Sequence, residues 1–396
     1  MKKILYGTTA LVAAGMFVGA SQADAAGVKL NLGGYFTGYG AYVDQDDGAT
    51  DAAVGHRDHT FDTDAEIYFQ GETTLENGIT VGAFMALETT DGFEGDSGRF
   101  DERYIYIEGG WGLLEFGENH GAAVQMAYVA PGAAPNAGLN SPDMLFHTDV
   151  GPGRFPVNLN AGTTINGIST ARTWNNFADD SQKLNYFTPR ISGIQLGLSY
   201  TPDTGNVVGN SAPGVEFDTT IGQQSQVWEM SANYVGKVQD VDVGVSWSYL
   251  TSDLEANSAA GGFEDRDAFS FGANLGWNGF TLGGSYLTDD TGTSGNADFN
   301  SFDIGLQYDM DAWSFSFAYA NAEQELVQTI GGANDEDTLD SFELAASYAL
   351  AAGVTLAGGI QYWEYESGQD GVTQAALAGN GNHDATVFFI GSSLEF

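Results

Sequence analysis

The segment Ala385-Thr386-Val387-Phe388-Phe389-Ile390-Gly391-Ser392-Ser393-Leu394-Glu395-Phe396 decides the fold. Successive side chains of a β-strand point to opposite faces. In this segment the two faces carry an apolar row and a polar row: Phe388, Ile390, Leu394 and Phe396 on one, and Gly391, Ser393 and Glu395 on the other. The alternation predicts a strand whose apolar face must be covered, and membrane lipid can cover it.

The same alternation recurs along the chain and predicts further strands. Phe269, Phe271, Leu275 and Trp277 alternate with small or polar residues, and Asn278-Gly279 then supplies a two-residue hairpin turn. We interpret the pattern as about 16 strands. They cover residues 29–42, 61–75, 79–88, 100–109, 113–118, 182–188, 193–201, 227–235, 241–250, 268–277, 280–288, 301–310, 312–322, 341–350, 354–365 and 385–396.

Charge and composition narrow the class of protein. The 396 residues include 53 acidic and 12 basic side chains, for a net charge of −41, which excludes nucleic acid as a partner because phosphate binding needs clustered cations. Cysteine is absent, which fits an exported protein. Lys2 and Lys3, the apolar stretch 4–20 and the Ala23-Asp24-Ala25 site predict a cleaved signal peptide over residues 1–25.

The predicted mature chain, residues 26–396, has no apolar run of roughly 18 residues and therefore no expected membrane-spanning helix. A closed barrel is the other structure that satisfies its backbone in lipid. Short turns, such as 76–78 and 351–353, alternate with long acidic loops, such as 202–224 and 323–340. This alternation is typical of outer-membrane barrels. We therefore predict an all-β protein, a transmembrane antiparallel β-barrel forming one domain, with a soluble sandwich as the competing fold.

The stretch 119–181 interrupts the strand pattern and contains five prolines, at positions 131, 135, 142, 152 and 156. A loop of this length usually has a function. It is the third long loop, and the lumen of a barrel this wide is too large for side chains alone to fill. We expect it to fold inward and constrict the channel; a disordered outer loop is the alternative.

Strand parity also predicts which acids face the lumen. The set comprises Asp62, Asp64, Glu66, Glu115, Glu229, Asp242, Asp303 and Glu343, together with Glu88 and Glu395 near strand ends. A low-dielectric wall focuses the field of such acids into the channel and raises the local cation concentration. The parity therefore predicts a cation-selective channel, unless many of these acids lie at the rim in bulk water.

Two stretches, 110–119 (Gly-Trp-Gly-Leu-Leu-Glu-Phe-Gly-Glu-Asn) and 183–202, together with the terminal Phe396, resemble those of the Gram-negative general porins of alphaproteobacterial type. The resemblance implies an outer-membrane homotrimer that passes small hydrophilic solutes passively and contacts membrane lipid. It also implies that Phe388, Ile390, Leu394 and Phe396 form the signal recognised by the β-barrel assembly machinery.

The resemblance further implies a constriction in which basic residues on the wall face acids on the loop. The basic candidates are Arg57, Arg103 and Lys183, with Arg99, Arg172 and Arg190 in reserve. The acidic candidates are Glu118, Asp143, Asp149, Asp179 and Asp180.

Other functions find less support in the sequence. A solute-specific channel and a non-conducting surface or adhesin barrel stay open as alternatives to a general porin. An enzyme, such as a barrel hydrolase, is not expected, because no histidine falls within a predicted strand. No cofactor and no confident metal site are expected; His56 and His59 beside Asp58, and weak Ca²⁺ binding at the acidic runs 44–47 and 334–337, are minor possibilities.

Overall fold

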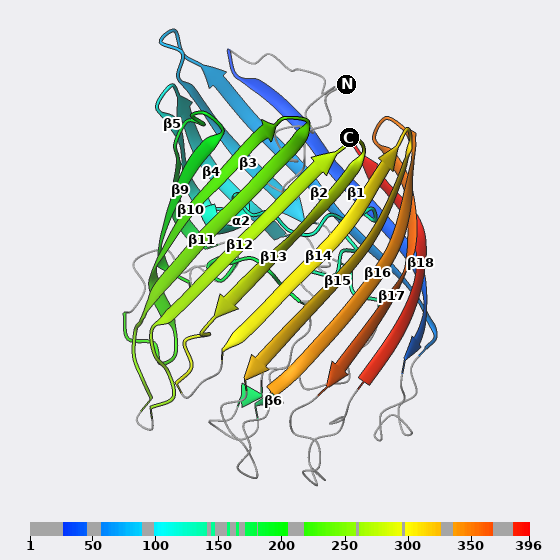
Figure 1. Ribbon diagram of the computed structural model, residues 1–396. Helices are drawn as coiled ribbons and strands as arrows, with labels where there is room; N and C mark the ends of the chain where they lie inside the picture. The colour runs from blue at the N-terminus through cyan, green and yellow to red at the C-terminus, as the bar shows by residue number, and fades with distance from the viewer. Residues whose placement is uncertain are drawn as a thin grey trace.

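The computed structural model describes residues 27–45, 57–88, 99–140, 144–146, 157–158, 164–165, 171–179, 181–204, 218–258, 261–294, 298–325, 336–366 and 383–396. Sixteen antiparallel strands form a closed barrel (Figure 1). The predicted fold class is thus confirmed. The strands are β1 (Lys29–Gln45), β2 (His59–Thr74), β3 (Thr80–Glu88), β4 (Arg99–Gly109), β5 (Gly112–Glu118), β8 (Gln182–Phe187), β9 (Ile194–Asp203), β10 (Gln224–Val238), β11 (Val241–Leu254), β12 (Arg266–Trp277), β13 (Phe280–Asp289), β14 (Phe299–Met310), β15 (Trp313–Glu325), β16 (Glu336–Ala351), β17 (Val354–Glu366) and β18 (His383–Glu395).

Closure joins the first strand to the last. β1 pairs with β18 from Tyr35 opposite Glu395 to Gln45 opposite Ala385. The terminal residue extends this ladder, because Gly34 and Phe396 exchange two backbone hydrogen bonds of 3.0 Å. The hydrogen-bonded cylinder therefore has no free strand edge.

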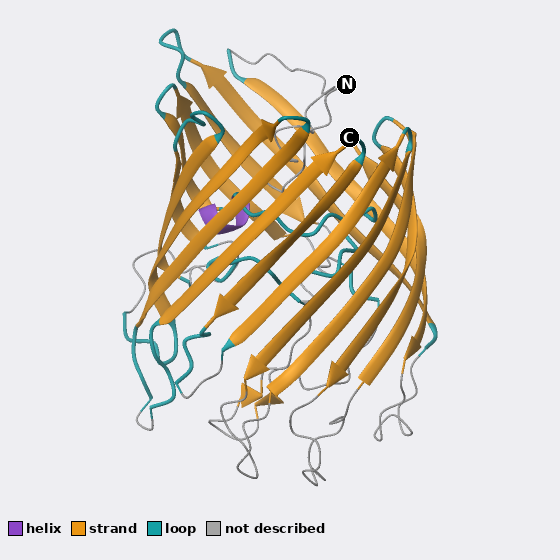
Figure 2. Cartoon of the chain, in the orientation of Figure 1, coloured by secondary structure: helices purple, strands orange, loops and turns teal. Residues whose placement is uncertain are grey.

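The two ends of the barrel differ, as the alternation of connections predicts. Short turns join the strands at the end where the C-terminus lies, which we call the turn end, and the long connections leave from the opposite loop end (Figure 2). Several strands run further toward the loop end than their apolar rows predict: β11 continues to Leu254 and β16 begins at Glu336. Backbone pairing continues there because it does not require an apolar face.

The outer face carries the apolar rows. Phe388 and Ile390 are 47% and 75% exposed, and Phe302, Ile304 and Leu306 form a matching row on β14. Aromatic pairs lie near both rims, as in an interfacial girdle. At the turn end they are Trp111–Tyr186, Phe280–Tyr308 and Trp313–Tyr348; at the loop end they are Tyr200–Trp228, Phe302–Tyr319 and Tyr319–Phe342.

Residues 119–140, 144–146 and 171–179 lie against the inner wall of the barrel, which confirms the inward-folded third loop, whereas β6 (Val157–Asn158) lies at the loop end (Figure 1). This loop contains the short helix α2 (Ala122–Gln125) and a hairpin of β6 and β7 (Thr164–Ile165) that sequence alternation does not predict. Within the described ranges no helix is both long enough and apolar enough to cross a membrane.

Candidate functional site

The first part of the long loop, residues 121–140, follows the inner wall, and we call it the loop belt. Its backbone N–H groups donate hydrogen bonds to inward side-chain oxygens on five strands. The pairs are Ala122 to Ser199 Oγ (2.7 Å, β9), Ala123 to Glu229 Oε2 (2.9 Å, β10), Tyr128 to Ser246 Oγ (2.9 Å, β11), Ala130 to Asp303 Oδ1 (3.1 Å, β14) and Ala133 to Ser316 Oγ (2.9 Å, β15). The belt therefore satisfies its own backbone by using the wall as a partner.

Glycines on the inner wall allow the belt to approach closely. A Cβ atom on Gly272 of β12 would lie 1.8 Å from the carbonyl oxygen of Tyr128, and one on Gly244 of β11 would lie 2.6 Å from the Tyr128 ring. Both distances are below any real contact. A side chain at Gly272 would push the belt backbone inward, and one at Gly244 would displace the Tyr128 ring.

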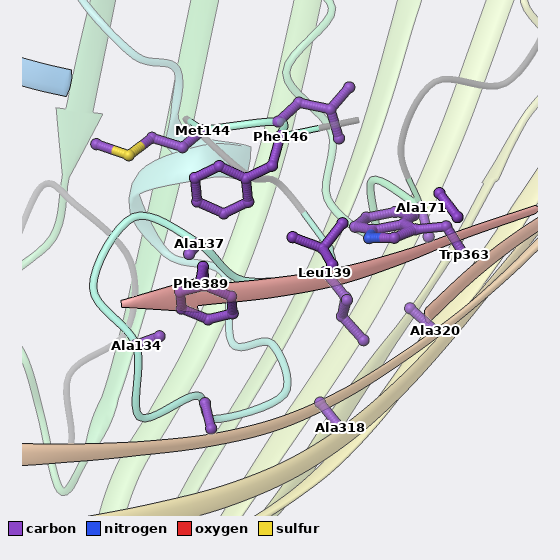
Figure 3. Close-up of a cluster of buried hydrophobic side chains, with 14 of the residues drawn as sticks. Ala134, Ala137, Leu139, Met144, Phe146, Ala171, Ala318, Ala320, Trp363 and Phe389 are labelled. Atoms are coloured by element: carbon purple, nitrogen blue, oxygen red, sulfur yellow. The ribbon is translucent and has the colours of Figure 1, made fainter. Parts of the chain in front are cut away.

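Farther along, the belt packs on an apolar part of the wall (Figure 3). Ala134, Ala137, Leu139, Met144 and Phe146 form one cluster with Ala318, Ala320, Trp363 and Phe389. Two polar contacts fix the register: Tyr39 Oη donates to the Pro135 carbonyl at 2.9 Å, and Gln361 Nε2 donates to the Ala137 carbonyl at 2.6 Å. This side of the barrel is therefore a packed interior.

The loop then returns across the same strands through residues 171–179. Thr173 Oγ1 donates to Asp303 Oδ2 at 3.0 Å, and Asn175 Nδ2 donates to Ser248 Oγ at 2.9 Å. Asp289 holds two cations, Arg172 of the loop at 3.2 Å and Arg266 of β12 at 2.5 Å. Arg266 also lies 3.9 Å from the centroid of the Phe177 ring, so this guanidinium is fully engaged.

The two ends of the loop meet at a partly buried ionic cluster. His120 pairs with Asp179 and lies 3.4 Å from Glu102 of β4. Lys183, only 2% exposed, donates to the Ala178 carbonyl at 2.6 Å and to the Asn119 carbonyl. Burial raises the pKa of Asp179, but His120, Lys183 and the Asn176 amide outweigh burial, so the pKa is lowered below the usual aspartate value. The cluster closes the loop at its base.

The predicted basic residues do not gather into one wall cluster. Arg103 shares the outward face with Ile105 and forms a bidentate pair with Glu118 on the outside of the barrel, so neither residue faces the lumen. Lys183 holds the loop through the Asn119 and Ala178 carbonyls, and Arg172 of the loop pairs with Asp289 on the wall. The remaining positions lie apart: Arg57 is exposed before β2, Arg190 sits in the turn after β8 with Gly193 and Gln195 as partners, and Arg99 begins β4 opposite Glu88, with its side chain outside the described set.

The predicted loop acids are represented only by Asp179 and Glu118, because Asp143, Asp149 and Asp180 lie outside the described residues. The predicted lumen acids all lie on the inward parity of their strands. Glu88 and Glu395 lie at strand ends, opposite Glu66 and Tyr35, and the other eight divide into two groups. One group is at most 5% exposed: Asp64, Glu115, Glu229, Asp303 and Glu343. The other is half-buried or more open: Asp62, Glu66 and Asp242.

The buried group fixes the loop and its surroundings. Asp303 alone accepts from Ala130, Asn140 and Thr173 of the loop. Glu115 accepts from Asn119, Gln125 and Asn185, Asp64 accepts from Asn136, and Glu343 accepts from Gln361. Asp242 instead pairs with Lys237 at the turn end, at 3.1 Å. Most of these carboxylates therefore serve as anchors.

A different surface covers the inner wall of β1 to β4. Tyr35, Tyr68, Phe84, Tyr104 and Tyr106 lie ring against ring across the four strands, and we call them the aromatic strip. Acids accompany the rings, including Asp62, Glu66 and Glu102. Sequence reasoning missed Glu102, His120 and Arg266; parity with Tyr104 and Tyr106 would have identified Glu102 as inward, whereas the roles of His120 and Arg266 depend on the course of the loop.

A closed barrel with apolar rows outside, polar groups inside and a loop across its lumen defines the class of membrane channel proteins. The chain belongs to the Gram-negative porin family, whose sequence model matches residues 7–368.

Solved structures show the same fold at low sequence identity. The barrel is similar to an anion-selective porin from Comamonas acidovorans (TM-score 0.60, 16% identity, 93% of this chain and 100% of that chain). It is also similar to a mutant of the Rhodobacter (Rh.) blastica porin (TM-score 0.56, 15% identity, with the same coverage of both chains).

Curated relatives come from Rickettsia and match a smaller part. An uncharacterised protein of Rickettsia typhi is 25% identical over 191 residues, which is 46% of this chain and 42% of that protein. An uncharacterised protein of Rickettsia conorii is 29% identical over 140 residues, 34% of this chain and 31% of the relative. The chain thus matches less than half the length of these relatives.

Proposed function

We propose that the protein forms a water-filled channel in the outer membrane, through which ions and small hydrophilic solutes diffuse passively, and that the channel prefers cations. One observation supports the preference for cations. The inner face of β2 to β4 presents Asp62, Glu66 and Glu102, whereas the loop and wall cations Lys183, Arg172 and Arg266 are already held by carbonyls or by Asp289.

The course of the loop belt supports a water path along the inner face of β2 to β4. The belt follows the inner wall from β9 through β15 and packs on β17, β18 and β1. Loop contacts with β2 and β4 are local, from Asn136 to Asp64 and from His120 to Glu102, so we infer that a path passes beside the rest of β2, β3 and β4. Carboxylates in a channel bounded by a low-dielectric wall attract cations at low salt, and mobile ions screen them as the salt concentration rises. The Comamonas porin is described as anion-selective, so the shared fold by itself does not set the sign of selectivity.

Planar-bilayer recording on the purified, refolded protein tests the proposal. We expect ohmic current steps and, under a KCl gradient, a reversal potential of the sign that K⁺ selectivity gives. Absence of steps would contradict the channel and favour a non-conducting surface barrel. Steps with a reversal potential of zero or of the opposite sign would contradict the role of Asp62, Glu66 and Glu102.

The proposal also covers how the barrel is exported and assembled in the outer membrane. We infer a homotrimer, a signal peptide removed after residue 25, and recognition of the outward row Phe388, Ile390, Leu394 and Phe396 by the assembly machinery. Exposure of this row on β18 and its position beside β1 support that reading. Within the described ranges no group of three or more His, Asp or Glu residues is arranged to hold a metal ion, and weak Ca²⁺ binding at the acidic loops stays a prediction.

A further inference from the structure

The aromatic strip joins four neighbouring strands into one surface inside the barrel. Ring centroids are 6.4 Å apart for Tyr35 and Tyr68, 5.6 Å for Tyr68 and Phe84, 5.2 Å for Phe84 and Tyr104, and 6.5 Å for Tyr104 and Tyr106. The strand register explains the contacts, since Phe84 lies directly opposite Tyr104. Such a surface can bind a solute where its rings are exposed to the lumen.

Carboxylates accompany the rings. Tyr35 Oη donates to Asp64 at 2.9 Å, and Tyr106 Oη donates to Glu72 at 2.9 Å. Glu66 lies opposite Tyr35 in the β1–β2 register and is also hydrogen-bonded to Tyr68. Hydrogen bonds of this kind hold carboxylates at the ring edges, so the surface is negative as well as aromatic.

The strip has an open part and a supporting part. Tyr68, Phe84 and Tyr106 are buried, whereas Tyr35, Tyr104 and Glu66 are half-buried on the inner wall. Glu102 is 15% exposed and lies beside His120 of the loop. At the turn end, Lys29 lies opposite Glu72 and supplies a positive charge. The open part is therefore confined to the region of Tyr35, Glu66, Glu102 and Tyr104.

We propose that this open part binds organic cations that carry a hydrocarbon or aromatic body, such as alkyl- or arylammonium ions, and retains them during passage. The proposal rests on the cation-preferring channel proposed above. Aromatic rings attract ammonium groups through their faces and also stack on apolar bodies. An inorganic cation gains only the carboxylates, and a neutral or anionic aromatic solute lacks their attraction.

Block of the K⁺ current in a planar bilayer tests the inference, with benzyltrimethylammonium as the probe and benzenesulfonate as the anion of similar shape. We expect saturable block by the cation and none by the anion. In the double variant Tyr35→Leu/Tyr104→Leu the blocking concentration should rise about tenfold. Phe317→Leu, on the lipid face of β15, should leave it unchanged.

A second double variant, Glu66→Gln/Glu102→Gln, replaces no ring and keeps an amide oxygen that can accept from Tyr68 and lie beside His120, and it too should weaken block about tenfold. Ohmic, cation-selective steps without saturable block would overturn this inference and leave the proposed channel intact. Absence of steps would overturn the channel itself. Block of equal strength in the wild type and in either conducting double variant would also overturn the inference.

Discussion

Asp303 holds both passes of the loop, and its replacement by alanine is the most direct test of how the constriction is fixed. The carboxylate is 4% exposed on the inner face of β14. Its Oδ1 accepts from the Ala130 N–H at 3.1 Å, and its Oδ2 accepts from Asn140 Nδ2 at 2.7 Å and from Thr173 Oγ1 at 3.0 Å. Ser285 adds two bonds from the neighbouring strand, which do not involve the loop.

Three hydrogen bonds to the loop set the size of the effect. A hydrogen bond contributes a net of about 1 kcal/mol, so Asp303→Ala should lower the free energy of loop opening by about 3 kcal/mol. Each 1.4 kcal/mol is a factor of ten, so the open fraction should rise about a hundredfold. The estimate is a lower bound, because bonds to a charged acceptor are stronger than neutral ones.

Hydrogen-exchange mass spectrometry of the folded protein in detergent measures this opening. Peptides covering residues 126–140 and 171–179 should exchange about a hundredfold faster in Asp303→Ala than in the wild type, because exchange follows the opening equilibrium. Asp303→Asn keeps an acceptor for Ala130 but places an amide against Asn140, so its acceleration should be smaller.

Asp242→Ala is the matched control. Asp242 also points inward but is about half exposed and pairs with Lys237 at the turn end. Its replacement should leave both loop peptides unchanged. An acceleration below tenfold in Asp303→Ala, or an equal one in the control, would refute the anchoring role.

Further predictions concern the close approach of the belt, the selectivity and the closure of the barrel. Gly272→Ala should destabilise the loop by about 2 kcal/mol and accelerate exchange in residues 126–140, whereas Gly38→Ala, where a Cβ meets nothing nearer than 3.5 Å, should not. Glu66→Gln/Glu102→Gln should move the reversal potential toward zero at 0.1 M KCl and have little effect at 1 M, because the screening length falls from about 10 Å to about 3 Å. Deleting Phe396 removes its two hydrogen bonds with Gly34 and should reduce the folded protein recovered in outer-membrane fractions, with normal recovery counting against a role for this terminus.

The barrel could be read from the sequence because its signal is repeated on every strand. Alternation depends only on neighbouring residues. Turning a strand over would move a whole apolar row, such as Phe302, Ile304 and Leu306, from the outer face to the lumen. Arg103 has the same parity as Ile105 on β4, and both residues point outward in the structure, so parity argues against the constriction role that the resemblance implies for Arg103. A resemblance to other porins cannot supply this information, since it transfers a pattern of charge and not a side-chain direction.

The loop could not be read in this way. Its contacts join residues far apart in the sequence, as between Ala130 and Asp303, and no local period encodes them. On β15, Ala318 and Ala320 are small inward residues that alternate with outward aromatic residues. This pattern predicts small side chains on the inner face, but it does not predict that Leu139 and Phe146 join them in one apolar cluster. The pairing of Arg172 and Arg266 with Asp289 likewise depends on where the loop returns.

The inward acids have two separable roles, and net charge alone does not distinguish them. A carboxylate whose oxygens already accept hydrogen bonds from the loop, such as Asp303 or Glu229, is committed to holding the constriction. A half-buried carboxylate on the uncovered wall, such as Glu66, keeps its field directed at the water path. Neutralising the first kind should therefore alter loop exchange more than selectivity, and neutralising the second kind should alter selectivity more than loop exchange. We therefore expect selectivity in this barrel to follow the acids that the loop leaves uncovered.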